Sequence, residues 1–182
     1  KNWSYEDFPE FTDEIEGAEV IPTTGDEIGI EYLHDVEYAR VQGISLYLQI
    51  LRPFTRNQPE KLWPCMVFVQ GSAWGRQDVY KKIPMLARLA GKGYVIAVVQ
   101  YRHSGQASFP AQAQDARNAI RFMRKNGLRY SADPEKIIAA GDSSGGHTAM
   151  FAAILEDDQE ETNLYPGVSA KVKGIIDYYG SV

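Results

Sequence analysis

One serine of the chain lies in a setting that could make it a nucleophile. Residues 141–145 are Gly-Asp-Ser-Ser-Gly; they follow a short apolar run at 137–140 and precede small and apolar residues at 148–155. This order predicts a strand, a sharp turn and a helix, with Ser143 in a strained backbone conformation at the carboxyl end of the strand. The glycines let strand and helix pass closely, and the start of the helix leaves N–H groups free beside the serine oxygen. Ser143 is therefore the candidate nucleophile.

The motif by itself is weak, and two other interpretations of it exist. Gly-x-Ser-x-Gly also occurs in ordinary turns, so the prediction depends on the strand before it and the helix after it. The run Gly-Asp-Ser-Ser-Gly-Gly also resembles the Gly-Asp-Ser-Gly-Gly of trypsin-like proteases, whose serine lies on a loop of an all-β double barrel, with the catalytic His and Asp upstream. A serine between a strand and a helix excludes that class.

A second loop could complete such a site. Residues 65–69 form a continuous apolar run, typical of a strand buried on both faces, and the small-residue loop 70–75 follows it. A serine that attacks an acyl carbon needs donors for the negative oxygen of the tetrahedral intermediate, and paired backbone N–H groups meet that need. One N–H belongs to Ser144, directly after the nucleophile, and we expect the other from residues 71–73.

Strand and helix signals alternate along most of the chain. Residues 28–38 and 44–52 alternate apolar and polar around a turn at Gln42-Gly43, which predicts an antiparallel hairpin. Further buried strands are predicted at 94–99, 136–140 and 172–179, and helices beginning near Pro84, after Phe109-Pro110 and at Ser144. Such alternation indicates an α/β fold, with a mostly parallel sheet flanked by helices and ligands at the carboxyl ends of its strands. Loops 70–75 and 141–147 both lie at that edge.

Together these segments resemble the α/β-hydrolase superfamily, within it the esterase and lipase branch that includes hormone-sensitive-lipase-like enzymes, acetyl esterases and feruloyl or carbohydrate esterases. The resemblance covers roughly residues 62–182, and it rests on Gln70-Gly71-Ser72-Ala73-Trp74, Tyr101-Arg102, Phe109-Pro110, residues 133–137, the elbow 141–147 and residues 177–180. It implies hydrolysis of a small-molecule carboxylic ester through an acyl intermediate on Ser143, without cofactor or metal. It also implies an oxyanion hole made by the N–H groups of Ser72, Ala73 and Ser144.

The sequence departs from the family pattern in two places. The family loop normally begins His-Gly-Gly, whereas this loop has Gln70 and Ser72, a change that backbone donors survive where φ tolerates a side chain. The family's catalytic order is Ser, then Asp or Glu, then His, and the only histidine after Ser143 is His147. In the family that position belongs to the elbow helix, so we expect His147 to pack internally, and we expect Asp177 to be structural.

The missing base and acid indicate an incomplete hydrolase. The chain ends just after the predicted strand 172–179, which would leave an exposed parallel edge. We therefore expect the last strands, the acid and the His of the fold to lie in a missing C-terminal segment or in a partner chain, and this chain alone to be nearly inactive. Residues 1–25 are predicted to form an acidic, aromatic arm, and residues 26–182 the incomplete α/β-hydrolase domain.

Composition and charge exclude several other classes. Residues 1–37 hold 12 of the 24 acidic residues and a single basic one, and no stripe of Lys and Arg with interleaved aromatics predicts nucleic acid as a partner. No apolar run is long enough to span a membrane, and no cluster of Cys or His predicts a metal site. The lone Cys65 is interpreted as a buried hydrophobic residue. Because the chain begins at Lys1, a targeting segment could have been removed, and the compartment stays open, with the cytoplasm favoured.

Two alternatives to an esterase stay open at this point. One is a peptidase of the same superfamily, disfavoured because Ser144 stands where those peptidases often have an aromatic residue. The other is a non-catalytic binding module with the same fold. An enzyme predicts downstream sequence that carries an Asp or Glu and then a His, whereas a binding module predicts neither.

Overall fold

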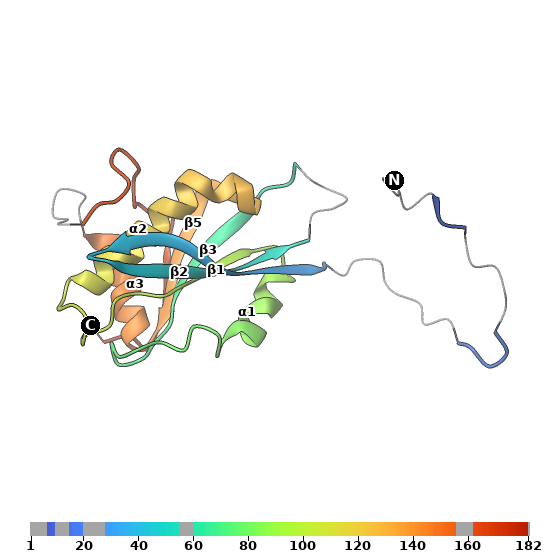
Figure 1. Cartoon of the computed structure of the whole chain (residues 1–182), viewed down its shortest axis with the longest axis horizontal. Helices are drawn as coiled ribbons and strands as arrows, with labels where there is room; N and C mark the ends of the chain where they lie inside the picture. Colours follow the sequence, from blue (N-terminus) through green and yellow to red (C-terminus); the bar gives the residue numbers. More distant parts are fainter. Residues whose placement is uncertain (1–6, 10–14, 20–27, 55–59, 156–161, 182) are drawn as a thin grey trace.

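The structure, a computed structural model of the chain, describes residues 7–9, 15–19, 28–54, 60–155 and 162–181 (Figure 1). The predicted N-terminal arm lies mostly outside these ranges, so the arm and the domain boundary that follows it stay predictions. Within the described ranges, no helix is both long enough and apolar enough to cross a bilayer.

The predicted hairpin is present at the start of the sheet. Strands β1 (Ile30–Val41) and β2 (Ile44–Pro53) pair antiparallel. Gln42 and Gly43 connect them, with φ angles of 51° and 81°. Positive φ at both central positions is the geometry of a two-residue turn that matches the twist of the flanking strands, and Gly43 adopts it without steric cost.

The remaining strands form the predicted parallel part of the sheet. They are β3 (Trp63–Val69), β4 (Val95–Val99), β5 (Ala132–Asp142) and β6 (Ile175–Tyr178), and the sheet order is β1-β2-β4-β3-β5-β6. β3 pairs parallel with β4 on one side and β5 on the other, β6 pairs parallel with β5, and β2 joins β4 antiparallel. The sheet therefore brings the carboxyl ends of β3 and β5 side by side, as the positions of the two loops require.

Helices cover the two faces of the sheet unequally. α2 (Ala111–Asn126) and α3 (Ser144–Ile154) pack on one face, whereas α1 (Ile83–Ala90) lies on the other (Figure 1). In β3, Val67 and Val69 belong to the core beneath α2 and α3, while Met66 and Phe68 belong to the core beneath α1. This alternation is the period-2 geometry of a strand buried on both faces.

The centre of the sheet excludes solvent, and it contains the only cysteine of the chain. Cys65, on β3, is fully buried beneath α2 and α3. Burial raises the pKa of its thiol to about 12. The residue is thus an unreactive core side chain, as interpreted from the sequence.

The last strand departs from the prediction of burial. All four residues of β6 are exposed, with Ile175 at 40% and Tyr178 at 57%. β6 is an edge strand, and its Ile176 and Tyr178 line an open groove on the α1 side of the sheet. The strand predicted at 172–179 is therefore present, but the prediction that it is buried is wrong.

Candidate active site

The predicted elbow is present between β5 and α3. Ser143 has φ 51° and ψ −130°, a region that non-glycine residues rarely adopt. Its own N–H donates to the carbonyl of Tyr178 at the end of β6, at 2.9 Å. A Cβ on Gly145 would lie 2.1 Å from the carbonyl oxygen of Val69, so only glycine permits this approach of α3 to β3. The strained serine is held by close packing on both sides.

Loop 70–75 passes directly over this elbow. A Cβ on Gly71 would lie 2.5 Å from the carbonyl oxygen of Asp142 and 2.9 Å from the Cβ of Ser143. The Gly71 N–H donates to Asp142 Oδ1 at 3.1 Å. Further along the loop, Ala73 and Trp74 both have positive φ, 51° and 56°. The loop is therefore tightly folded and in contact with the turn that carries Ser143.

The three predicted oxyanion donors differ in availability. Neither the N–H of Ala73 nor that of Ser144 has a hydrogen-bond partner among the residues that the structure describes, and Ser144 is the first residue of α3, where N–H groups lack intrahelical partners. The Ser72 N–H instead donates to Ser144 Oγ at 3.0 Å. In this conformation, contrary to the expectation for Ser72, only Ala73 and Ser144 offer free donors.

Hydroxyl groups brace the loop from its other side. Ser72 Oγ donates to the carbonyl of Gly75 at 2.7 Å and lies 3.0 Å from the phenol oxygen of Tyr101. The Tyr101 hydroxyl also donates to the carbonyl of Gln70, at 3.2 Å. Burial raises the pKa of Tyr101, so the phenol keeps its proton and remains a donor. The Gln70 side chain, where the family has His, donates to the carbonyl of Asp78 at 2.7 Å and so has a structural contact.

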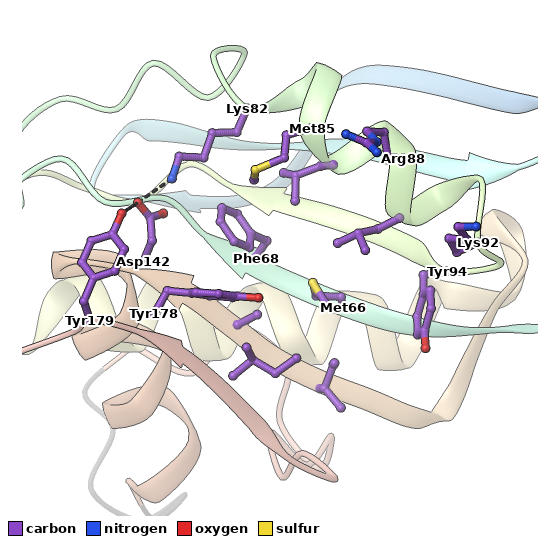
Figure 2. A pocket seen from close by; sticks show the side chains of 15 residues that line it. Met66, Phe68, Lys82, Met85, Arg88, Lys92, Tyr94, Asp142, Tyr178 and Tyr179 are labelled. Carbon is purple, nitrogen blue, oxygen red and sulfur yellow. Dashed lines mark hydrogen bonds and ion pairs between the residues drawn. The ribbon is translucent and has the colours of Figure 1, made fainter.

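An ion pair lies beside the elbow on the α1 face. Lys82, just before α1, places its Nζ 2.5 Å from Asp142 Oδ2, and the Tyr179 hydroxyl donates to the same oxygen at 3.4 Å (Figure 2). A groove of about 680 Å³ extends from this pair along the sheet, between α1 and β6, as far as Tyr94 (Figure 2). Its walls are mostly apolar, including Met66 and Phe68 on β3.

Aromatic rings line a second hollow, of about 430 Å³, next to the elbow helix. The His147 ring lies edge-on to Trp74, with centroids 5.2 Å apart, and against Phe151 at 4.6 Å. Phe109 closes the same side, with its ring 6.2 Å from His147. The backbone N–H of His147 donates to the carbonyl of Ser143 at 3.2 Å, so His147 is one helical turn beyond Ser143. Its ring packs among aromatics, in agreement with the expectation of internal packing.

The structure places no catalytic base or acid beside Ser143. In the described part of the chain, none of the three histidine side chains is hydrogen-bonded to the Ser143 hydroxyl. His34 lies exposed on β1, His103 accepts from the Gly105 N–H, and Asp177 Oδ1 accepts from the Gly180 N–H at 2.9 Å. Asp177 thus has the structural contact expected of it. No group of three or more His, Cys, Asp or Glu among the described residues could hold a metal ion.

Sequence reasoning missed three features of this site: the acceptor role of the Ser144 hydroxyl, the ion pair of Lys82 with Asp142, and the aromatic hollow. The spacing of His147 and Phe151, four residues apart on a predicted helix, could have indicated that their rings meet. The other partners come from separate loops, so only the fold brings them together.

Taken together, this sheet order, with a strained serine between β5 and α3 beneath a small-residue loop, defines an α/β-hydrolase of the esterase and lipase type. The family model described as BD-FAE matches residues 48–182. The chain belongs to this family.

Curated relatives and solved structures agree with that placement. The chain is 30% identical to "Esterase LipC" of Mycobacterium tuberculosis over 69% of this chain and 32% of that protein. It is 33% identical to "Probable isoprenylcysteine alpha-carbonyl methylesterase ICME" of Oryza sativa subsp. japonica, over 68% of this chain and 30% of that protein. The butyrate-bound esterase Est2 of Thermogutta terrifontis superposes with a TM-score of 0.73 at 26% identity, covering 82% of this chain and 53% of that one. The chain thus spans about a third of these curated relatives and about half of the solved esterase.

Proposed function

We propose that the chain carries the nucleophile and the oxyanion hole of a carboxylic-ester hydrolase. The observation that supports this most directly is Ser143 itself, a strained serine at the end of β5. Beside it, on the loop and on the helix, the N–H groups of Ala73 and Ser144 have no hydrogen-bond partner in the described part of the chain. The names of the relatives and of the solved neighbour, all esterases, support the same reaction class.

In the proposed reaction, Ser143 Oγ forms a bond to the ester carbonyl carbon while a histidine takes the hydroxyl proton. The carbonyl π electrons move to oxygen, and the N–H groups of Ala73 and Ser144 hold that oxyanion; the loss of one such donor costs roughly 3 kcal/mol in other enzymes. The C–O bond to the alcohol then breaks, and the alcohol leaves with the proton from the histidine. Water repeats the sequence on the acyl-serine and releases the acid.

The histidine of this scheme is proposed to come from outside this chain's described residues. The side chains of His34, His103 and His147 make contacts with other groups, and none of them is hydrogen-bonded to the Ser143 hydroxyl. The base and its acid would therefore come from a further segment of the natural protein or from a partner chain. A serine hydroxyl without a base is a poor nucleophile, so the 182-residue chain alone should react very slowly.

Labelling with a fluorophosphonate tests the proposal. The protein from the natural gene should gain one probe mass and hydrolyse a short-chain aryl ester, whereas Ser143→Ala should show no labelling and a loss of hydrolysis of at least about 10⁴-fold. Ser169→Ala is the matched control, because Ser169 lies on a loop in contact with Arg124 and Lys171 and should behave like wild type. Labelling that persists in Ser143→Ala would refute the assignment, and a wild-type protein that is never labelled would favour a non-catalytic binding module.

A further inference from the structure

The side chain of Ser144 holds two backbone N–H groups of the loop above it. Its Oγ accepts from Ser72 at 3.0 Å and from Trp74 at 3.2 Å. Ser144 is only 4% exposed, so water does not compete for this oxygen. The two donors flank Ala73 in the chain, and they converge on one atom of the residue that directly follows the nucleophile.

The loop needs such contacts because its conformation is strained. Ala73 and Trp74 are consecutive non-glycine residues with positive φ, an arrangement that persists only where surrounding contacts hold it. Tyr101 and the Ser72 hydroxyl brace the loop against its own residues, and the Tyr101 phenol also interacts with the Ser144 hydroxyl. The loop backbone itself is tied to the elbow by the two N–H bonds to Ser144 Oγ and by the bond from the Gly71 N–H to Asp142.

The arrangement also selects which N–H is free. With the N–H groups of Ser72 and Trp74 both directed at Ser144 Oγ, the N–H of Ala73 between them is the one that has no partner within the described ranges. We infer that the Ser144 hydroxyl is a positioning residue: it locks loop 70–75 to the nucleophile's helix and so presents Ala73, rather than Ser72, as the loop's oxyanion donor. This inference rests on the proposed function, and it gives Ser144 two roles, with the backbone N–H as a donor and the side chain as the anchor of the second donor.

Removal of the hydroxyl tests the inference with two independent measurements on the protein from the natural gene. In Ser144→Ala, the amides of residues 72 and 74 lose their acceptor, so their hydrogen exchange should become about tenfold faster, the equivalent of one net hydrogen bond. The turnover number kcat should fall about tenfold or more with KM nearly unchanged, because a misplaced donor weakens binding of the transition state and not of the ester.

Thr148→Val provides the matched control. Thr148 is buried one turn further along α3, and its hydroxyl donates to the carbonyl of Ser144 at 2.8 Å without touching the loop. This variant removes a buried hydroxyl from the same helix, and it should leave loop exchange and kcat as in wild type.

The outcomes separate this inference from the proposed function. Unchanged exchange at residues 72 and 74 in Ser144→Ala would overturn the inference, and so would faster exchange with an unchanged kcat. A higher kcat would overturn it as well, since it would mean that the hydroxyl withholds the Ser72 donor. A wild-type protein that hydrolyses no ester would refute the proposed function, while the exchange result would still decide whether Ser144 holds the loop.

Discussion

The two faces of the sheet each carry an ion pair near the elbow edge, but the two pairs differ in their surroundings. Beneath α2, the guanidinium of Arg102 and the carboxylate of Asp115 are both buried, with Nη2 and Oδ1 2.9 Å apart. On the α1 face, the half-buried Lys82 pairs with the buried Asp142 at the end of an open groove, next to Ser143. The pair on the α2 face is thus part of the closed interior, whereas the pair on the α1 face lies where a ligand could approach the elbow.

The largest expected effect comes from breaking the buried pair. Arg102→Met leaves the Asp115 carboxylate buried without its partner, so the free energy of unfolding should fall by about 3–5 kcal/mol. Urea titration measures this loss. Lys82→Met is the comparison on the open face, where Asp142 keeps the Gly71 N–H and the Tyr179 hydroxyl as donors, so the loss should be only about 1 kcal/mol. Equal losses in the two variants would show that the two ion pairs contribute equally to the free energy of unfolding, contrary to the prediction.

Two methionines sharpen the same comparison for apolar contacts. Met123 on α2 is 0% exposed, whereas Met85 on α1 is 53% exposed in the groove. Met123→Ala should lower the free energy of unfolding by about 2–5 kcal/mol, because it opens a cavity in a closed core. Met85→Ala should change it by less than about 0.5 kcal/mol. A large loss for Met85→Ala would indicate that the groove is covered in the protein as isolated.

The smallest expected effect concerns acid and the carboxylate of Asp35, in the irregular part of β1. Hydrogen bonds from Gln49 and Tyr80, and then from His34, lower the pKa of Asp35 in the folded state. A depressed pKa contributes stability above the unfolded pKa, and that contribution is lost as the pH falls through the folded value. Asp35→Asn should therefore be less stable than wild type at pH 7, and the difference should shrink below about pH 4.

Urea midpoints measured across this range provide the check. Glu60→Gln is the matched control: this exposed carboxylate has no hydrogen bond or ion pair in the described structure, so its removal should leave the pH dependence unchanged. A gap between wild type and Asp35→Asn that stays constant with pH would contradict the prediction.

The features that local pattern determines were predictable. The hairpin followed from alternation around Gln42-Gly43, and the elbow followed from an apolar run, two glycines and a serine. In each case the signal is the period of a regular element or the steric requirement of a single turn.

The features that depend on distant parts of the chain were not predictable. The apolar residues of β6 and the exposed Met85 and Leu89 of α1 show that a pattern reveals which side chains could be buried, not whether an element covers them. Loop 70–75, the proposed oxyanion loop, illustrates a second limit. Whether the Ser72 N–H is free depends on the orientation of a hydroxyl more than 70 residues later, and no local period encodes that contact.

The burial of Cys65 has a practical consequence for spectroscopy and labelling. Because this thiol is the only one in the chain and its pKa is about 12, maleimides and other thiol reagents should leave the folded protein unmodified. A cysteine introduced at an exposed position such as Tyr179 would then be labelled selectively, without replacement of the native residue. The native thiol itself would react only when the centre of the sheet opens, so its rate of modification under denaturant would report that opening directly.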